Sequence, residues 1–226
     1  MRMLALAFPF SLAFAAPAAA ATELIVNGGF ESGAFTPYTP GAHYDVITSG
    51  GAQDLTGWTV GNSLVWGQGA TDINTHVGAG FVDFTGIGNT VPHGALFQTL
   101  ATTSGQTYNF SLFTTLDIAN PVAGIIVTIG GVPLTLSGIN GVWDYSPTGA
   151  IWRQVTGSFV AGGASSVLSI AGQPGSSFMI GVDDVSVQAA ALSGGVPEPA
   201  TWAMMLLGVA AVGIGMRRRR RVAVPA

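Results

Sequence analysis

Residues 108–113 read Tyr-Asn-Phe-Ser-Leu-Phe, and this alternation decides the fold class. Tyr108, Phe110 and Leu112 fall on one face of an extended strand and the polar residues between them on the other, because successive side chains of a strand point to opposite sides. The apolar run at 125–129 reads Ile-Ile-Val-Thr-Ile and indicates a strand covered on both faces. Both segments therefore predict β-structure.

Further strands follow outward from these two segments. The sequence predicts strands at 24–26, 57–60, 63–67, 78–84, 94–101, 106–115, 122–129, 132–137, 151–160, 165–171 and 177–188. Residues 32–56 look like a loop, since Pro37, Pro40 and Gly41 form turns. Only 8% of residues are charged and 33 are glycine, which is unlike a protein of long amphipathic helices. We expect an all-β fold, an antiparallel jelly-roll β-sandwich over residues 22–190.

Charge is distributed very unevenly along the chain. Between residues 22 and 190 the only lysine or arginine is Arg153, which faces ten acidic residues. A domain this acidic repels phosphate backbones, so nucleic acid is excluded as a partner. The chain has no cysteine, which excludes disulfides, thiolate metal sites and cysteine nucleophiles.

The N-terminal residues 1–21 are typical of a secretory signal peptide. Arg2 supplies the positive start, residues 3–14 are apolar, and Pro17 precedes four alanines that end at Ala21. Signal peptidase is therefore an expected partner, with cleavage after Ala20 or Ala21. The alternative, a buried first helix, lacks an amphipathic face.

The C-terminal end has three parts in a fixed order. Residues 191–199 form a linker that ends in Pro197, Glu198 and Pro199, and residues 200–216 contain no charge. Seventeen helical residues extend about 25 Å, so the sequence predicts a short transmembrane helix there. The tail at 217–226 is expected to stay cytoplasmic, because its arginines are costly to move across a bilayer. These membrane-stop arginines are Arg217, Arg218, Arg219, Arg220 and Arg221.

The Pro-Glu-Pro boundary, the short apolar helix and the arginine cluster together resemble the PEP-CTERM sorting signal. That resemblance implies processing by an exosortase-type membrane transpeptidase, and export in a Gram-negative-type bacterium that makes extracellular polysaccharide. We expect a membrane-anchored precursor that is then sorted to the cell surface or extracellular matrix. The alternative is a plain permanent anchor.

Three motifs in the middle of the chain carry a second resemblance. They are the opening LIVNGGFESG at 24–33 with GWTV at 57–60, the pair FQTL at 97–100 and GQTY at 105–108, and the closing IGVDDVSV at 180–187. In this order they resemble DUF642-type and galactose-binding-like carbohydrate-binding jelly rolls over most of residues 23–188. Residues 116–150 match no such pattern. The resemblance implies a carbohydrate-binding module without catalytic activity.

The same resemblance implies a structural Ca²⁺ ion. Its ligands are expected to be the carboxylates of Glu31 and Asp183 and the carbonyl of Gly29, since calcium prefers hard oxygen ligands. Strand alternation puts Asp183 and Asp184 on opposite faces, so only one of them is expected to be a ligand. The alternative is that Glu31 ends a turn and the aspartates occupy solvent-side strand positions.

Exposed aromatic residues are the candidates for sugar binding, because the apolar face of a sugar ring stacks on them. Trp143 and Tyr145 lie in the segment 140–147, which looks like an exposed loop, and Trp66 is a further candidate. Trp58 and Trp152 fall on predicted strands and are assigned to the core.

Signatures of enzymes do not occur in the sequence. It contains no nucleophile elbow, zinc-protease motif, P-loop or dinucleotide fingerprint. His43, His76 and His93 are scattered over predicted loops and are interpreted as ordinary loop residues. We expect a non-catalytic module that binds extracellular polysaccharide. A structural or adhesive matrix protein and an uncharacterised exported hydrolase are the alternatives.

Overall fold

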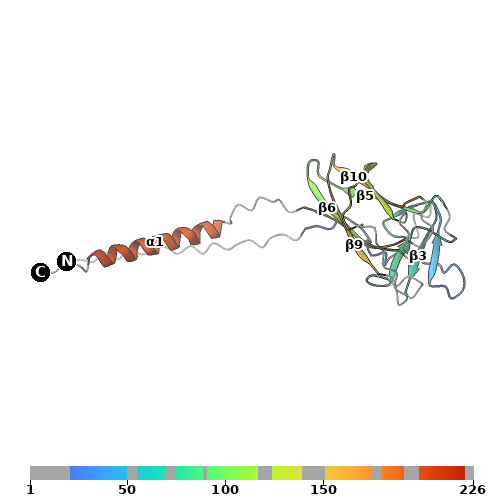
Figure 1. Cartoon of the computed structure of the whole chain (residues 1–226), viewed down its shortest axis with the longest axis horizontal. Helices are drawn as coiled ribbons and strands as arrows, with labels where there is room; N and C mark the ends of the chain where they lie inside the picture. Colours follow the sequence, from blue (N-terminus) through green and yellow to red (C-terminus); the bar gives the residue numbers. More distant parts are fainter. Residues whose placement is uncertain are drawn as a thin grey trace. The chain divides into compact units, whose positions relative to one another are not determined.

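A computed structural model describes residues 21–49, 55–69, 75–88, 91–116, 124–138, 151–174, 180–190 and 199–221. The chain divides into a unit of residues Ala21–Ala190, which holds all the described strands, and a unit that contains helix α1. Figure 1 shows the strands gathered into the β unit.

Two antiparallel sheets make up the β unit, and their strand orders mix segments that are distant in sequence. The six-stranded sheet has the order β1 (Tyr44–Ile47), β3 (Leu64–Gln68), β4 (Gly80–Asp83), β11 (Ile180–Ala189), β6 (Thr107–Leu116) and β9 (Arg153–Val160). The five-stranded sheet has the order β2 (Thr59–Gly61), β5 (Ala95–Ala101), β10 (Ser165–Gly172), β7 (Ile125–Ile129) and β8 (Val132–Pro133). The predicted all-β antiparallel sandwich is confirmed.

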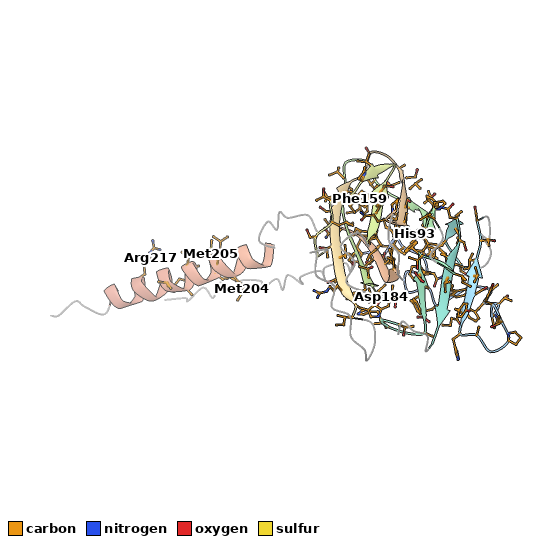
Figure 2. The ribbon with its side chains drawn as sticks, turned by 45° about the vertical axis from the view of Figure 1, so that its right-hand side comes forward. His93, Phe159, Asp184, Met204, Met205 and Arg217 are labelled. Carbon is orange, nitrogen blue, oxygen red and sulfur yellow. The ribbon has the colours of Figure 1, made fainter. Side chains whose placement is uncertain are left out.

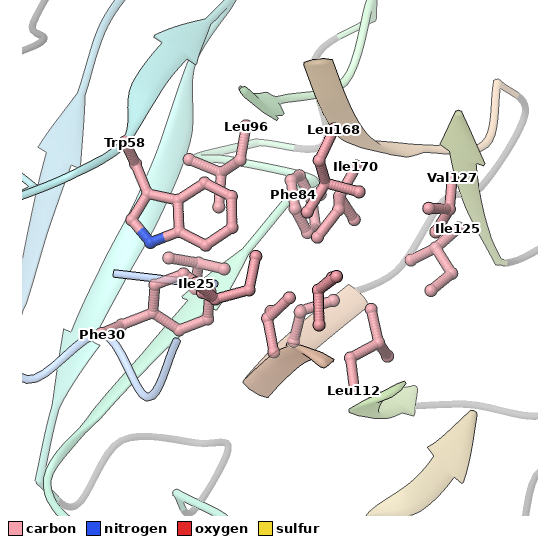
Figure 3. Packing of buried hydrophobic residues seen from close by; sticks show 14 of the residues in the cluster. Ile25, Phe30, Trp58, Phe84, Leu96, Leu112, Ile125, Val127, Leu168 and Ile170 are labelled. Atoms are coloured by element: carbon pink, nitrogen blue, oxygen red, sulfur yellow. The ribbon is translucent and has the colours of Figure 1, made fainter. Parts of the chain in front are cut away.

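The hydrophobic core combines apolar side chains from both sheets. Trp58, Phe84 and Leu96 lie in one buried cluster with Leu112 and Ile170, as Figure 3 shows. Tyr108, Phe110 and Leu112 are buried, so the alternation at 108–113 does mark the core face of β6. Each fully buried side chain of this size contributes about 1.5–3 kcal/mol to folding, which makes this cluster the main source of stability.

Two strand predictions differ from the structure near the N-terminal end. The segment 24–26 forms no strand, although Glu23 makes an isolated bridge with Gln188 and Ile25 packs in the core. Strand β1 lies inside 32–56, which the sequence predicted to be a loop. The four residues of β1 are too few to show alternation, and their pairing with β3 is made only in the folded chain.

Helix α1 spans Pro199–Arg221, so it begins at the predicted boundary and continues through the arginine cluster. Pro199 suits the first helical position, where its missing N–H is not needed. Figure 2 labels Met204, Met205 and Arg217 along it. Within the part of the chain that the structure describes, no helix combines the length and apolar character that crossing a bilayer requires. The helix predicted at 200–216 is therefore present, but the transmembrane span assigned to it is not found. The arginines are its last residues and not a separate tail.

Three other predictions lie outside the described residues. These are the signal peptide apart from residue 21, the linker with Pro197 and Glu198, and the segment 140–147 with Trp143 and Tyr145.

Candidate binding face on the six-stranded sheet

Outward-pointing side chains of β6 mark one broad surface of the six-stranded sheet, called here the outer face. Asn109, Ser111 and Phe113 alternate with core residues, so they point away from the core. The register places polar residues beside the first two and an aspartate beside the third. The rows across β11, β6 and β9 are Gln188–Asn109–Ser158, Ser186–Ser111–Thr156 and Asp183–Phe113–Gln154.

The first two rows form the floor of a groove of about 620 Å³. Thr135 and Ser137 also line it, and Ser137 is tied to β9 by two backbone hydrogen bonds with Thr156. Every polar side chain that lines this groove carries a hydroxyl or an amide group. These residues are Asn109, Ser111, Thr135, Ser137, Thr156, Ser158, Ser186 and Gln188. The groove is therefore an uncharged, hydrogen-bonding surface, called here the polar groove.

Glu23 lies beside β11 and orders two side chains of the polar groove. Its Oε2 accepts hydrogen bonds from Ser186 Oγ at 2.6 Å and from Gln188 Nε2 at 3.2 Å. Burial disfavours the charged carboxylate, but these bonds and those from the Val187 and Ile25 N–H groups outweigh it and hold the pKa of Glu23 below its usual range. Glu23 thus stays charged and fixes the directions of Ser186 and Gln188.

A β-bulge interrupts β11 where the polar groove ends. Between Asp183 and Ser186 the pairing with β6 shifts, so that one extra residue stands on β11. Asp184 has a φ of 50°, a left-handed conformation that aspartate tolerates better than most residues. Figure 2 labels Asp184 on the β unit. The expectation that alternation separates the two aspartates is wrong, because the extra residue brings both carboxylates to one side.

The two carboxylates hold the loop that precedes β4. Asp183 Oδ2 accepts hydrogen bonds from the His76 N–H at 3.1 Å and the Val77 N–H at 3.3 Å. His76 Nδ1 lies 2.6 Å from Asp184 Oδ2. Burial, together with the negative charge of Asp184, raises the pKa of Asp183 to about 7. The loop at 75–80 is thereby tied to the bulge.

Aromatic rings cover the row next to the polar groove. The His76 ring stacks on Phe113 with their centres 3.7 Å apart and an angle of 17°. Trp152 lies 6.0 Å from His76 and 6.3 Å from Phe81, centre to centre. His76, Phe113 and Trp152 are each half-buried, so part of their surface faces solvent. His76, Phe81, Phe113 and Trp152 are called here the aromatic cluster.

The residues predicted to bind calcium do come together. A Cβ placed on Gly29 would lie 3.8 Å from Glu31 Cγ and 3.9 Å from Asp183 Oδ1. Glu31 Oε1 accepts hydrogen bonds from the N–H groups of Ala79 and Gly80, at 2.9 and 3.0 Å. The carboxylates of Asp183 and Asp184 thus lie together at the bulge, whereas Glu31 uses its carboxylate to hold the backbone at 79–80.

Sequence reasoning missed two members of this region. His76, Asp183 and Asp184 offer ligand atoms that all lie within 4.8 Å of one another, a group that could hold a metal ion. His76 stands more than one hundred residues before the aspartates, so no local spacing signals it. The strand pattern gives no sign of the bulge, so it does not indicate Asp184 as a ligand beside Asp183.

Trp66 is not a ligand-binding residue. It is completely buried, its indole N–H donates to the Phe30 carbonyl at 2.9 Å, and Phe35 packs edge-on against its ring. Its position on the core face of β3 leaves no surface for a sugar. The assignment of Trp58 to the core is confirmed, whereas Trp152 is half-buried in the aromatic cluster and not in the core.

The C-terminal end of the chain matches a known protein-sorting motif. Residues 195–221 match the PEP-CTERM protein-sorting motif. This motif implies export, processing by an exosortase and sorting to the cell surface. No curated protein matches the chain.

Solved structures with a similar β-sandwich include several sugar-binding domains. A putative sugar-binding protein from Bacteroides thetaiotaomicron is 13% identical with a TM-score of 0.43, over 75% of this chain and 100% of that one. The CBM22-1 xylan-binding domain of Xyn10C from Paenibacillus barcinonensis is 15% identical with a TM-score of 0.37, over 64% and 91%. The K2 cleaved adhesin domain of Lys-gingipain is 16% identical with a TM-score of 0.41, over 76% and 98%. These three structures do not show a DUF642 family.

Proposed function

We propose that the outer face binds a neutral polysaccharide without catalysing its breakdown. The observation that carries this proposal is the order of the rows on β6. Hydroxyl and amide side chains line the polar groove, and the next row, at Phe113, carries the aromatic cluster.

The chemistry of the two surfaces matches the two sides of a sugar. Hydroxyls and amides both donate and accept hydrogen bonds, as sugar hydroxyls do. The apolar C–H face of a sugar ring suits a half-exposed aromatic surface such as that of Phe113, His76 and Trp152. A chain of sugars lying along β6 would meet both surfaces in turn.

Charge selects a neutral polymer over an acidic one. The unit carries ten acidic residues against Arg153 alone, and the Glu23 carboxylate is in direct contact with Ser186 and Gln188. Uronate or sulfate groups in the polar groove would be repelled by these carboxylates. The export implied by the C-terminal motif would place this face outside the cell, where the polymer is the extracellular polysaccharide.

A divalent cation near the bulge is part of the proposal. The neighbouring carboxylates of Asp183 and Asp184, with the His76 ring beside them, support it, and such an ion would join the loop at 75–80 to β11. Calcium held by Gly29, Glu31 and Asp183 stays the prediction made from the sequence. Thermal unfolding of the full chain with and without EDTA tests it, and an unchanged melting temperature contradicts a bound structural ion.

Affinity electrophoresis of the full chain in gels that contain neutral or acidic polysaccharides tests glycan binding. Thr156→Val keeps the shape of the side chain but removes a groove hydroxyl, and should weaken retardation by a neutral polymer about fivefold to tenfold. Thr99→Val is the matched control, since Thr99 is exposed on β5 of the other sheet. Equal retardation of both variants and the parent would contradict the polar groove as the site. No retardation by any polymer would favour the adhesive alternative.

A further inference from the structure

We propose that His76, Asp183 and Asp184 bind a divalent transition-metal ion of the Zn²⁺ class. This inference rests on the cation site of the proposed function and names the class of ion it takes. It adds a nitrogen ligand to a site that the sequence predicted to contain oxygen alone.

The geometry of the three side chains is close to that of a metal site. Each offers one ligand atom, and these atoms lie within 4.8 Å of one another. Ligands about 2.0–2.2 Å from a tetrahedral Zn²⁺ ion stand roughly 3.5 Å apart. Small movements of side chains therefore suffice, and the ion would replace the direct contact between His76 Nδ1 and Asp184 Oδ2.

The ligands are held in position by contacts that need no metal. Stacking on Phe113 fixes the plane of the His76 ring, and the His76 N–H donates to Asp183 Oδ2. Asp183 Oδ1 accepts the N–H of Asp184, which fixes the first carboxylate against the bulge. A metal site whose ligands are held in this way loses little entropy when the ion binds.

The charge of the region suits a doubly charged ion. Two adjacent carboxylates lie at the bulge, and one of them, that of Asp184, is paired with His76. A neutral imidazole with two carboxylates brings two negative charges to the ion, which a divalent cation balances.

The imidazole decides between the two classes of ion. Calcium takes six to eight oxygen ligands, whereas Zn²⁺ and its neighbours accept imidazole nitrogen with carboxylate oxygen. The His76 ring faces the carboxylate of Asp184, so an ion bound there meets a nitrogen atom. The ion would clamp the loop at 75–80 to β11, beside the aromatic cluster.

Calorimetric titration of the EDTA-treated full chain with ZnCl₂, and separately with CaCl₂, tests the inference. His76→Phe keeps a ring against Phe113 and removes the nitrogen, and should lower the affinity for Zn²⁺ by at least about tenfold. Asp184→Asn, which keeps a residue that tolerates the left-handed backbone, should also lower it. His43→Phe is the matched control, because His43 is exposed on a loop, and should leave it unchanged. Circular dichroism confirms that each variant is folded.

Co²⁺ serves as a spectroscopic probe of the same site, and the visible bands of the bound ion should change in His76→Phe. Absent Zn²⁺ binding, or equal Zn²⁺ affinity in the parent and His76→Phe, would overturn the inference. Calcium binding that is tighter than Zn²⁺ binding and insensitive to His76→Phe would overturn it in favour of an oxygen-only site. Metal binding is measured without polysaccharide, so a failure of glycan binding would count against the proposed function alone.

Discussion

Asp83 shows how a single buried carboxyl influences the stability of this fold. It is 4% exposed on β4, and its Oδ1 accepts hydrogen bonds from the N–H and hydroxyl of Thr85 and from the N–H of Ile180. Burial disfavours the charged form and raises the pKa of Asp83 despite these bonds and the nearby His93. The protonated carboxyl therefore suits the folded state better than the carboxylate.

The pH dependence of unfolding should reflect this shift. The pKa of Asp83 in the folded state lies above its unfolded value of 3.8. The protonated carboxyl therefore contributes to the free energy of unfolding, fully below the unfolded value, and this contribution is lost as the pH rises through the folded pKa. Asp83→Asn keeps the Oδ1 acceptor and removes the charge, so its stability relative to the parent should increase from pH 4 to pH 8. Urea unfolding at several pH values measures this. A constant difference between the two proteins would show that Asp83 does not titrate with folding.

Trp66 is a second single residue whose replacement should lower the stability of the fold. Trp66→Phe leaves the Phe30 carbonyl without its donor and opens a cavity beside Phe35, so it should cost about 2–4 kcal/mol of unfolding free energy. Polysaccharide retardation of the folded variant should stay unchanged, because Trp66 does not reach the outer face. Tyr38→Phe on an exposed loop is the control and should leave stability unchanged. A loss of retardation with Trp66→Phe would restore Trp66 as a binding residue.

At the scale of elements, the bulge in β11 determines which side chains stand on the outer face. It brings Asp184 beside Asp183 and ends the regular alternation that lines the polar groove with Ser186 and Gln188. Without the bulge, Asp184 would point into the sandwich, and the His76 ring would lose its contact with the Asp184 carboxylate. The loop at 75–80 would then be held only by Asp183 and Glu31.

Two substitutions at Asp184 separate its backbone role from its side-chain role. Asp184→Gly and Asp184→Ala both remove the contact with His76, but only glycine adopts a φ of 50° without strain. Asp184→Ala should therefore be less stable than Asp184→Gly by about 1 kcal/mol, measured by chemical denaturation. Equal stability of the two would indicate that the bulge relaxes in the variants.

The whole chain combines an acidic β unit with a C-terminal sorting segment. The match at 195–221 implies that the chain is exported and processed by an exosortase. Mass spectrometry of protein recovered from the surface of producing cells should find a mature chain that lacks the residues up to Ala20 or Ala21 and the arginine-rich end. An intact 226-residue chain in the cytosol would contradict the assignment to the surface.

Local pattern was sufficient for the sandwich and for the sorting motif at the C-terminal end. Alternation at 108–113 identified the buried side of β6, and the order of Pro197, Glu198, Pro199 and the arginines identified the sorting motif, because each signal is contained within a few neighbouring residues. The short strand β1 gave no such signal, since its pairing with β3 supplies what its four residues lack.

The candidate site needed contacts across long separations. The extra residue in β11 brings the carboxylates of the neighbouring residues Asp183 and Asp184 to the same side of the sheet. Packing places His76, which comes from a loop distant in sequence, against Phe113. Trp66 is of a residue type that suits sugar binding, yet the pairing of β3 with β4 places its side chain in the core. The direction of a side chain depends on register and partners, which arise only when the sheets assemble.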